Sequence, residues 1–171
     1  DMLGHYHTYA CKYSENARFA HRIPVLNKQG NAFIARDSSR KESFHYFRMG
    51  MKRLVIELET DNVVYFLVHL ALGYRARQNQ LRELYDLVKS VDKPVVVAGD
   101  FNALWGEHEI ELFLGATGLV NPNREGTATF PSWKPKRHLD FVLHSPELVT
   151  RDFRVPQVQY SDHLPMVWEF D

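Results

Sequence analysis

Polar residues that could do acid–base or metal chemistry stand at the ends of apolar segments. The first group is Gly99-Asp100-Phe101-Asn102, whose carboxylate and amide lie two positions apart and lean to the same side if strand geometry persists. A carboxylate can hold a metal ion or a water, and an amide can donate to a phosphate oxygen. Taken alone, this tetrapeptide is slightly more typical of an ordinary strand-to-loop turn.

Two further groups combine a carboxylate with a histidine. In His138-Leu139-Asp140 the aspartate either caps a loop or fixes the tautomer of a histidine elsewhere. In Ser161-Asp162-His163-Leu164-Pro165 the residues form either a plain turn or a carboxylate for a divalent cation beside an imidazole for proton transfer. His69 ends another apolar segment, where a lone histidine is more often a core residue than a catalyst. The groups gain weight together, because catalytic residues gather where strand ends share one rim of a sheet.

Apolar segments of strand and helix length would position these groups. Apolar residues at three- and four-residue spacing predict a helix over 75–90, and a short helix is expected over 107–114, closed by Gly115 or Gly118. The charged stretch 36–53 predicts a surface loop or an exposed hairpin, with a solvated face favoured over a binding site. Strands are predicted over 30–35, 54–58, 63–70, 95–98, 139–143, 155–159 and 166–170. Many strands with few helices between them favour packed sheets with helices outside.

Composition restricts the class of protein. A chain of 171 residues, 44% of them hydrophobic, suits one globular domain, 1–171. The formal net charge of zero does not by itself indicate a polyanionic partner. Cys11 is the only cysteine, so an intrachain disulfide and a Cys-rich zinc site are excluded. We expect no transmembrane helix and, because nothing argues for secretion, favour a cytoplasmic location.

The polar groups belong to an ordered series of short motifs. The series is Val68-His69-Leu70, Arg77 with Gln80-Leu81, 97–102, 129–132 (Thr-Phe-Pro-Ser), 139–143 and 161–165. In this order the motifs resemble the endonuclease/exonuclease/phosphatase superfamily, which includes pancreatic deoxyribonuclease, apurinic endonucleases, neutral sphingomyelinases, inositol polyphosphate 5-phosphatases and deadenylases. Any one motif is a weak match, but the ordered set is very specific and covers the chain from about Gly30 to its end.

The resemblance implies an α/β (α+β) fold of two packed, mostly antiparallel β-sheets flanked by helices, a four-layer sandwich. It also implies a catalytic set that hydrolyses a phosphodiester or phosphomonoester by water attack without a covalent intermediate. His163 would face the scissile phosphate and be oriented by Asp140. Asp100 would activate or position the water, Asn102 would hold the phosphate or the water, and His69 would bind the phosphate or assist the leaving group.

The resemblance further implies a Mg²⁺ or Mn²⁺ cofactor, with Asp162, Asp100 and Asn102 among its ligands. In the superfamily an early Asn and a later Gln-Glu pair precede the stretch that aligns here with 3–36, and that Glu is the main magnesium ligand. No Gln-Glu occurs upstream of Gly30, and Glu15 lies in polar sequence. We therefore expect the chain to lack the N-terminal strands of the domain, which would leave metal binding incomplete and expose a sheet edge through which it could self-associate.

The substrate stays open at this stage. Basic residues with an aromatic neighbour suit nucleic acid, but they equally suit an inositol phosphate or a phospholipid headgroup. For Lys134 to Arg137 a solvated loop has about equal weight. The alternative to an enzyme is a non-catalytic fragment or relative that acts as a binding module. The candidate substrate-binding residues are Arg77, Trp133, Lys134 and Arg137, with Arg75 and Lys136 nearby.

Overall fold

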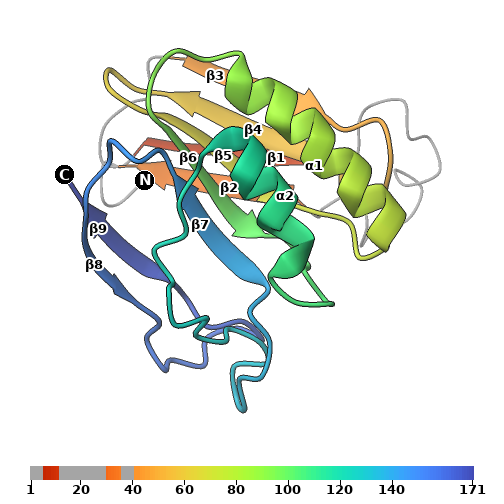
Figure 1. Cartoon of the computed structure of the whole chain (residues 1–171), viewed down its shortest axis with the longest axis vertical. Helices are drawn as coiled ribbons and strands as arrows, with labels where there is room; N and C mark the ends of the chain where they lie inside the picture. The colour runs from red at the N-terminus through yellow and green to blue at the C-terminus, as the bar shows by residue number, and fades with distance from the viewer. Residues whose placement is uncertain (1–5, 12–29, 36–40) are drawn as a thin grey trace.

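The computed structural model describes residues 6–11, 30–35 and 41–171. Within these ranges the chain is a mixed α/β fold with several sheets and two helices, α1 (Tyr74–Lys89) and α2 (His108–Thr117) (Figure 1). The strands are β1 (Tyr6–Cys11), β2 (Gly30–Ala35), β3 (Lys41–Tyr46), β4 (Leu54–Glu59), β5 (Val64–His69), β6 (Val95–Asp100), β7 (Asp140–His144), β8 (Thr150–Arg154) and β9 (Val167–Phe170).

The centre of the fold is a five-stranded sheet in the order β3-β4-β5-β6-β7. Its neighbours are antiparallel except for β5 and β6, which run parallel because α1 crosses over between them. Apolar, β-branched and aromatic residues dominate β5 and β6, as expected of strands with both faces covered. The parallel pair brings the last residues of two strands to one edge of the sheet, where the site is built.

The two helices cover one face of this sheet, as Figure 1 shows. From α1, Leu81 and Leu84 are buried in a cluster that also contains Phe66, Val97 and Phe141 of the sheet. Ile110 and Phe113 of α2 belong to the same cluster. Helix α2 ends at Thr117 and is capped by Gly118, whose left-handed conformation, with φ 79°, suits a residue without a side chain.

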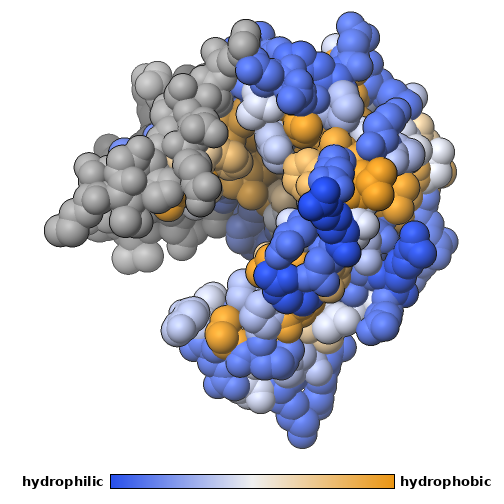
Figure 2. Space-filling view, turned by 90° about the vertical axis from the view of Figure 1, so that its left-hand side faces the viewer, coloured by the Kyte–Doolittle hydropathy of each residue, from blue (hydrophilic) through white to orange (hydrophobic). Residues whose placement is uncertain are grey.

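The opposite face is covered by two separate two-stranded sheets, β1–β2 and β8–β9. Phe33 of β2 packs against Leu54, Ile56 and Leu58, whereas Trp168 and Phe170 of β9 pack near Val63 and Val96. Figure 2 shows a hollow on one side of the molecule, with apolar residues visible in and beside it. The family resemblance predicts two packed sheets flanked by helices. The described residues instead form one large and two small sheets, and both helices lie on one face of the large sheet.

Most predicted elements are confirmed, but the strand predicted over 155–159 is wrong. The strand is β8, five residues earlier, where it pairs with β9 up to the register partners Arg154 and Val167. Pro156 has no N–H to donate to a ladder, so pairing ends before it. Part of the predicted loop or hairpin over 36–53 is strand β3. No helix of the described part of the chain is long and apolar enough to cross a membrane.

Candidate active site

Three adjacent strands bring His69, Asp100 and Asp140 to the same edge of the central sheet. His69 is the last residue of β5, Asp100 the last of β6, and Asp140 the first of β7. The ladder pairs His69 with Asp100 and Asp100 with Asp140. One residue earlier in the β5–β6 ladder, Val68 pairs with Gly99. Gly99 has φ +139°, and a Cβ at this position would lie only 1.9 Å from the carbonyl oxygen of Val68.

A tight turn after β6 holds the Asp100 carboxylate. Asn102 adopts φ +50°, a left-handed conformation that asparagine tolerates better than most residues. Its backbone N–H donates to Oδ1 of Asp100 at 2.8 Å, and its Nδ2 lies 3.2 Å from Oδ2. The same Nδ2 donates to the carbonyl of Leu70 at 2.9 Å. Asn102 therefore fixes the carboxylate relative to the ends of both β5 and β6.

Asp100 is also paired with His69, whose Nε2 lies 3.1 Å from its Oδ2. Burial alone would raise the pKa of Asp100. The hydrogen bond and positive potential from His69, the Asn102 N–H and the more distant His163 outweigh burial, so the pKa of Asp100 lies below its ordinary value. The carboxylate is consequently ionised at neutral pH.

A second imidazole–carboxylate pair joins His163 to Asp140. Nδ1 of His163 lies 2.7 Å from Oδ2 of Asp140, and the buried hydroxyl of Thr129 donates to the same oxygen at 2.5 Å. The carboxylate acceptor places a proton on Nδ1, which leaves Nε2 for a ligand. Phe130 packs on the imidazole with a ring-centroid distance of 4.8 Å.

The segment that follows Thr129 also secures the loop carrying His163. The backbone N–H of Ser132 donates to the carbonyl of Asp162 at 2.8 Å, and its hydroxyl donates to the carbonyl of Ser161 at 2.6 Å. The N–H of Leu164 donates to the carbonyl of Thr129 at 2.8 Å. The two motifs that contain these residues, far apart in sequence, thus form one support for the imidazole.

Both pairs line one pocket of about 560 Å³. All six residues predicted to act in catalysis or metal binding lie on its wall: His69, Asp100, Asn102, Asp140, Asp162 and His163. The remaining lining residues are Lys52, Leu72, Leu104, Phe130, Leu139 and Ser161. The pocket therefore combines carboxylates, imidazoles and one amide with a partly apolar wall.

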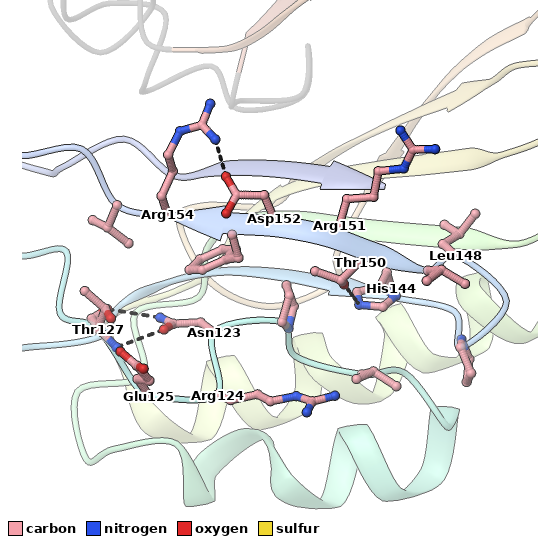
Figure 3. A pocket seen from close by; sticks show the side chains of 16 residues that line it. Asn123, Arg124, Glu125, Thr127, His144, Leu148, Thr150, Arg151, Asp152 and Arg154 are labelled. Atoms are coloured by element: carbon pink, nitrogen blue, oxygen red, sulfur yellow. Dashed lines mark hydrogen bonds and ion pairs between the residues drawn. The ribbon is translucent and has the colours of Figure 1, made fainter. Parts of the chain in front are cut away.

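A larger cavity of about 690 Å³ lies between the 120–127 loop and β8 (Figure 3). Two of its three arginines are engaged in surface ion pairs: Arg154 with Asp152 and Glu169, and Arg151 with Asp171. Figure 3 shows Asn123 bonded instead within its own loop, to Thr127. None of the six predicted residues lines this cavity, so its size does not identify it as the reaction site.

A comparison with known protein families matches residues 5–163 to the Endonuclease/Exonuclease/phosphatase family. The chain belongs to this family. Its members are typically divalent-metal-dependent phosphoesterases. The match spans the ordered motifs that form the pocket, from His69 to His163.

Individual relatives are distant. A UPF0294 protein of Vibrio parahaemolyticus is 27% identical over 110 residues, which cover 60% of this chain and 37% of that protein. A 3′ phosphatase from Neisseria, bound to a product DNA hairpin, has a TM-score of 0.72 at 17% identity, with 99% of this chain and 80% of that one covered. A mannosyl-6-phosphatase of Bacteroides thetaiotaomicron has a TM-score of 0.72 at 14% identity, with 98% and 77% covered. The chain thus spans well under half the length of the Vibrio parahaemolyticus protein.

The candidate substrate-binding residues lie outside the pocket. Arg77 is fully buried; its guanidinium pairs with Glu109 and donates to the carbonyls of Ala71 at 2.9 Å and Leu72 at 2.7 Å. This arginine supports the loop after β5 and has no exposed surface with which to contact a substrate. Trp133, Lys134 and Arg137 are exposed in the segment after Phe130, beyond the pocket wall. Arg75 and Lys136 are likewise absent from that wall.

One residue of the pocket was missed by the sequence reasoning. Lys52 belongs to the charged stretch that was interpreted as a solvated face, yet it lines the pocket and its Nζ contacts Nε2 of His69. Nothing in its local sequence distinguishes it from the other cations of that stretch. Its position is set by the loop between β3 and β4, which no strand or helix pattern predicts.

The oxygen ligands that the described residues provide do not complete a metal site. Asp100, Asn102 and Asp162 are the hard donors that Mg²⁺ prefers, and all three line the pocket. However, both Asp100 oxygens are engaged by Asn102, and Asp162 accepts from the Ser161 hydroxyl at 3.0 Å. Among residues 6–11, 30–35 and 41–171 no group of three or more His, Cys, Asp or Glu is arranged around a common cation position. Glu15 lies outside the described residues.

Proposed function

We propose that this chain carries a divalent-metal-dependent phosphoesterase site that hydrolyses a phosphodiester or a phosphomonoester by direct attack of water. The observation that carries the proposal is the convergence of two imidazole–carboxylate pairs, His69 with Asp100 and His163 with Asp140, on one pocket. Family membership supports the reaction class.

His163 is the proposed proton-transfer group. Asp140 holds the proton on Nδ1, so Nε2 faces the phosphate and can donate to or accept from an oxygen there. The bond to Asp140 also stabilises the imidazolium that forms when Nε2 takes a proton. Asp140 acts through His163 and is therefore a positioning residue.

Asp100 is the proposed water-binding residue. It remains ionised, so it can accept a hydrogen bond from water and orient the water's oxygen toward phosphorus. A new P–O bond forms from the water, whose proton passes to Nε2 of His163, while the ester P–O bond breaks and the leaving oxygen takes a proton. His69, on the neighbouring strand end, lies where it can bind the phosphate or deliver that proton.

Mg²⁺ or Mn²⁺ remains part of the proposal, with Asp162, Asp100 and Asn102 as contributing ligands. When bound, such an ion would neutralise charge on the phosphoryl oxygens. Because the described residues fall short of a full ligand set, we assign no reaction step to the metal. The same shortfall is what favours the second candidate function, a phosphate-binding module without turnover.

Two classes of substrate have support. The structurally similar Neisseria 3′ phosphatase holds a DNA hairpin product, and the similar Bacteroides enzyme is a mannosyl-6-phosphatase. Exposed Trp133 with Lys134 and Arg137 beside the His163 loop favours a nucleic acid, because aromatic and cationic side chains bind bases and phosphates. An inositol phosphate or a phospholipid headgroup would use the same cations.

The purified chain, assayed with Mg²⁺ or Mn²⁺, tests the proposal. Substrates would be p-nitrophenyl phosphate, bis(p-nitrophenyl) phosphate, a 3′-phosphorylated DNA hairpin, RNA, mannose 6-phosphate, an inositol polyphosphate and sphingomyelin. His163→Ala should lower kcat by about 10² or more. His108→Ala, at an exposed histidine of α2 outside the pocket, is the matched control. No turnover by the wild type with phosphate still bound would favour the binding module. Equal loss of kcat in both variants would refute the specific role of His163.

A further inference from the structure

The loop between β3 and β4 is built so that one lysine enters the pocket. Lys52 is half-buried, lines the pocket and contacts Nε2 of His69. The loop is closed at its base, where the backbone N–H of Phe47 donates to the carbonyl of Arg53 at 2.8 Å and Phe47 is 2% exposed. The position of Lys52 is consequently fixed by the fold.

Gln80 of α1 fastens this loop to the segment that follows His69. Its side chain is fully buried. Its Nε2 donates to the carbonyls of Met49 at 2.8 Å and Lys52 at 2.6 Å, while its Oε1 accepts from the N–H of Ala71 at 2.8 Å. One amide thus joins the loop carrying Lys52 to the end of the β5 strand.

Gly50 allows this contact to form. It has φ +95°, and a Cβ there would lie 2.7 Å from Nε2 of Gln80. A side chain at residue 50 would therefore strain the backbone and displace the amide at the same time. The Gly50–Gln80 contact has no reaction chemistry of its own, so it serves placement of the loop.

Lys52 is the cation of a pocket whose wall is rich in carboxylates. Asp100, Asp140 and Asp162 put carboxylates on the wall, and Lys52 is the only Lys or Arg among the lining residues in the described part of the chain. An anionic phosphate ester entering such a pocket needs a cation to offset this repulsion. An ammonium suits the task, because it is a compact charge with rotatable donors.

The geometry points to Lys52 as a phosphate-binding residue of this site, and to Gln80 as the residue that positions it. The assignment rests on the proposed phosphoesterase function and adds a named anion contact to it. Nε2 of His69 cannot accept from Lys52 and donate to Asp100 at once. When the ammonium turns to a phosphoryl oxygen, His69 is left free to donate to Asp100.

Titration with inorganic phosphate, alongside KM and kcat for whichever ester the wild type cleaves, tests this assignment. Lys52→Gln should weaken phosphate binding and raise KM by about tenfold or more, the usual scale for one charge-assisted hydrogen bond. Lys52→Arg should retain most of the affinity. Lys41→Gln, at an exposed lysine of β3 outside the pocket, is the charge-matched control and should change neither value.

Gln80→Glu keeps the acceptor for Ala71 but removes the donors to Met49 and Lys52. It should raise KM through Lys52, so adding Lys52→Gln should raise it no further. Gly50→Ala should have the same effect if the Glu variant does not fold. A lower melting temperature with unchanged phosphate affinity would show that Gln80 is only structural.

The outcomes separate this inference from the function on which it rests. Turnover by the wild type with unchanged phosphate affinity in Lys52→Gln would refute the lysine assignment and leave the phosphoesterase intact. Phosphate binding that depends on Lys52, without turnover, would support the lysine and refute the enzyme. A wild type that binds no phosphate at millimolar concentration would contradict the assignment.

Discussion

Asp140→Asn tests whether Asp140 and His163 act as one unit. The Oδ2 atom of Asp140 accepts from His163 and from Thr129, and the Asp140 side chain is 16% exposed. A hydrogen bond to a charged group contributes about 1.5–3 kcal/mol, and low exposure limits screening by water. Loss of about 2 kcal/mol of imidazolium stabilisation corresponds to roughly 30-fold in kcat/KM. The amide could also favour the wrong tautomer of His163, which would make the loss larger.

The assay is steady-state hydrolysis of the best ester from the substrate series, for Asp140→Asn, His163→Ala and the double variant. If Asp140 acts through His163, the double variant should be little worse than His163→Ala alone. Thr129→Val is the matched control, because it removes the other donor to the same oxygen without touching the imidazole. It should cost less than Asp140→Asn. Additive losses in the double variant would refute the unit and make Asp140 an independent participant.

Four further expectations follow from the same geometry. Asp100→Asn should abolish measurable turnover while the melting temperature falls by only a few degrees, because the isostere can still bond the Asn102 N–H; a collapse in stability would make the residue structural. The folded-state pKa of Asp100 lies below its ordinary value of about 3.9, so ionisation of Asp100 stabilises the folded state. This stabilisation is fully present above about pH 4 and is lost as the pH falls through the folded-state pKa. The melting-temperature difference between wild type and Asp100→Asn should therefore shrink below about pH 4, and a difference that grows on acidification would contradict the sign. Hydrolysis should disappear in excess chelator and return with Mg²⁺ or Mn²⁺, whereas full activity in chelator would exclude the proposed cofactor. If the apolar patches of Figure 2 and the edge of a small sheet mediate self-association, sedimentation should show a concentration-dependent dimer, and a monomer throughout would refute that contact.

The strand ends that bear the site could be predicted from the sequence because each follows a continuous apolar run. His69, Asp100 and Asp140 stand at such ends, and the register of a sheet leaves little freedom in where they meet. The resemblance to the family supplied the residues that come from irregular segments, such as His163. Hydrophobic pattern alone would have left that histidine in an ordinary turn.

Residues whose placement depends on tertiary contacts were not predicted. Arg77 was predicted to contact substrate as one of the basic residues near the site, yet it is buried against the carboxylate of Glu109, which is distant in sequence. Lys52 was interpreted as a solvated cation because the contacts of Gln80 and Gly50 that position its loop exist only in the folded chain. The strand wrongly predicted over 155–159 contains two valines, but they stand three positions apart, and Pro156 between them has no N–H to donate to a ladder.

Gly99 has a consequence for mutational tolerance. Its φ of +139° and the 1.9 Å approach of a would-be Cβ to the Val68 carbonyl leave no room for any side chain between β5 and β6. Every substitution would push the two strands apart one residue before the His69–Asp100 pair. In a saturation library scored by activity, position 99 should therefore behave like a catalytic residue although it carries no reactive group, and the ranking of its variants should follow side-chain volume instead of polarity or charge.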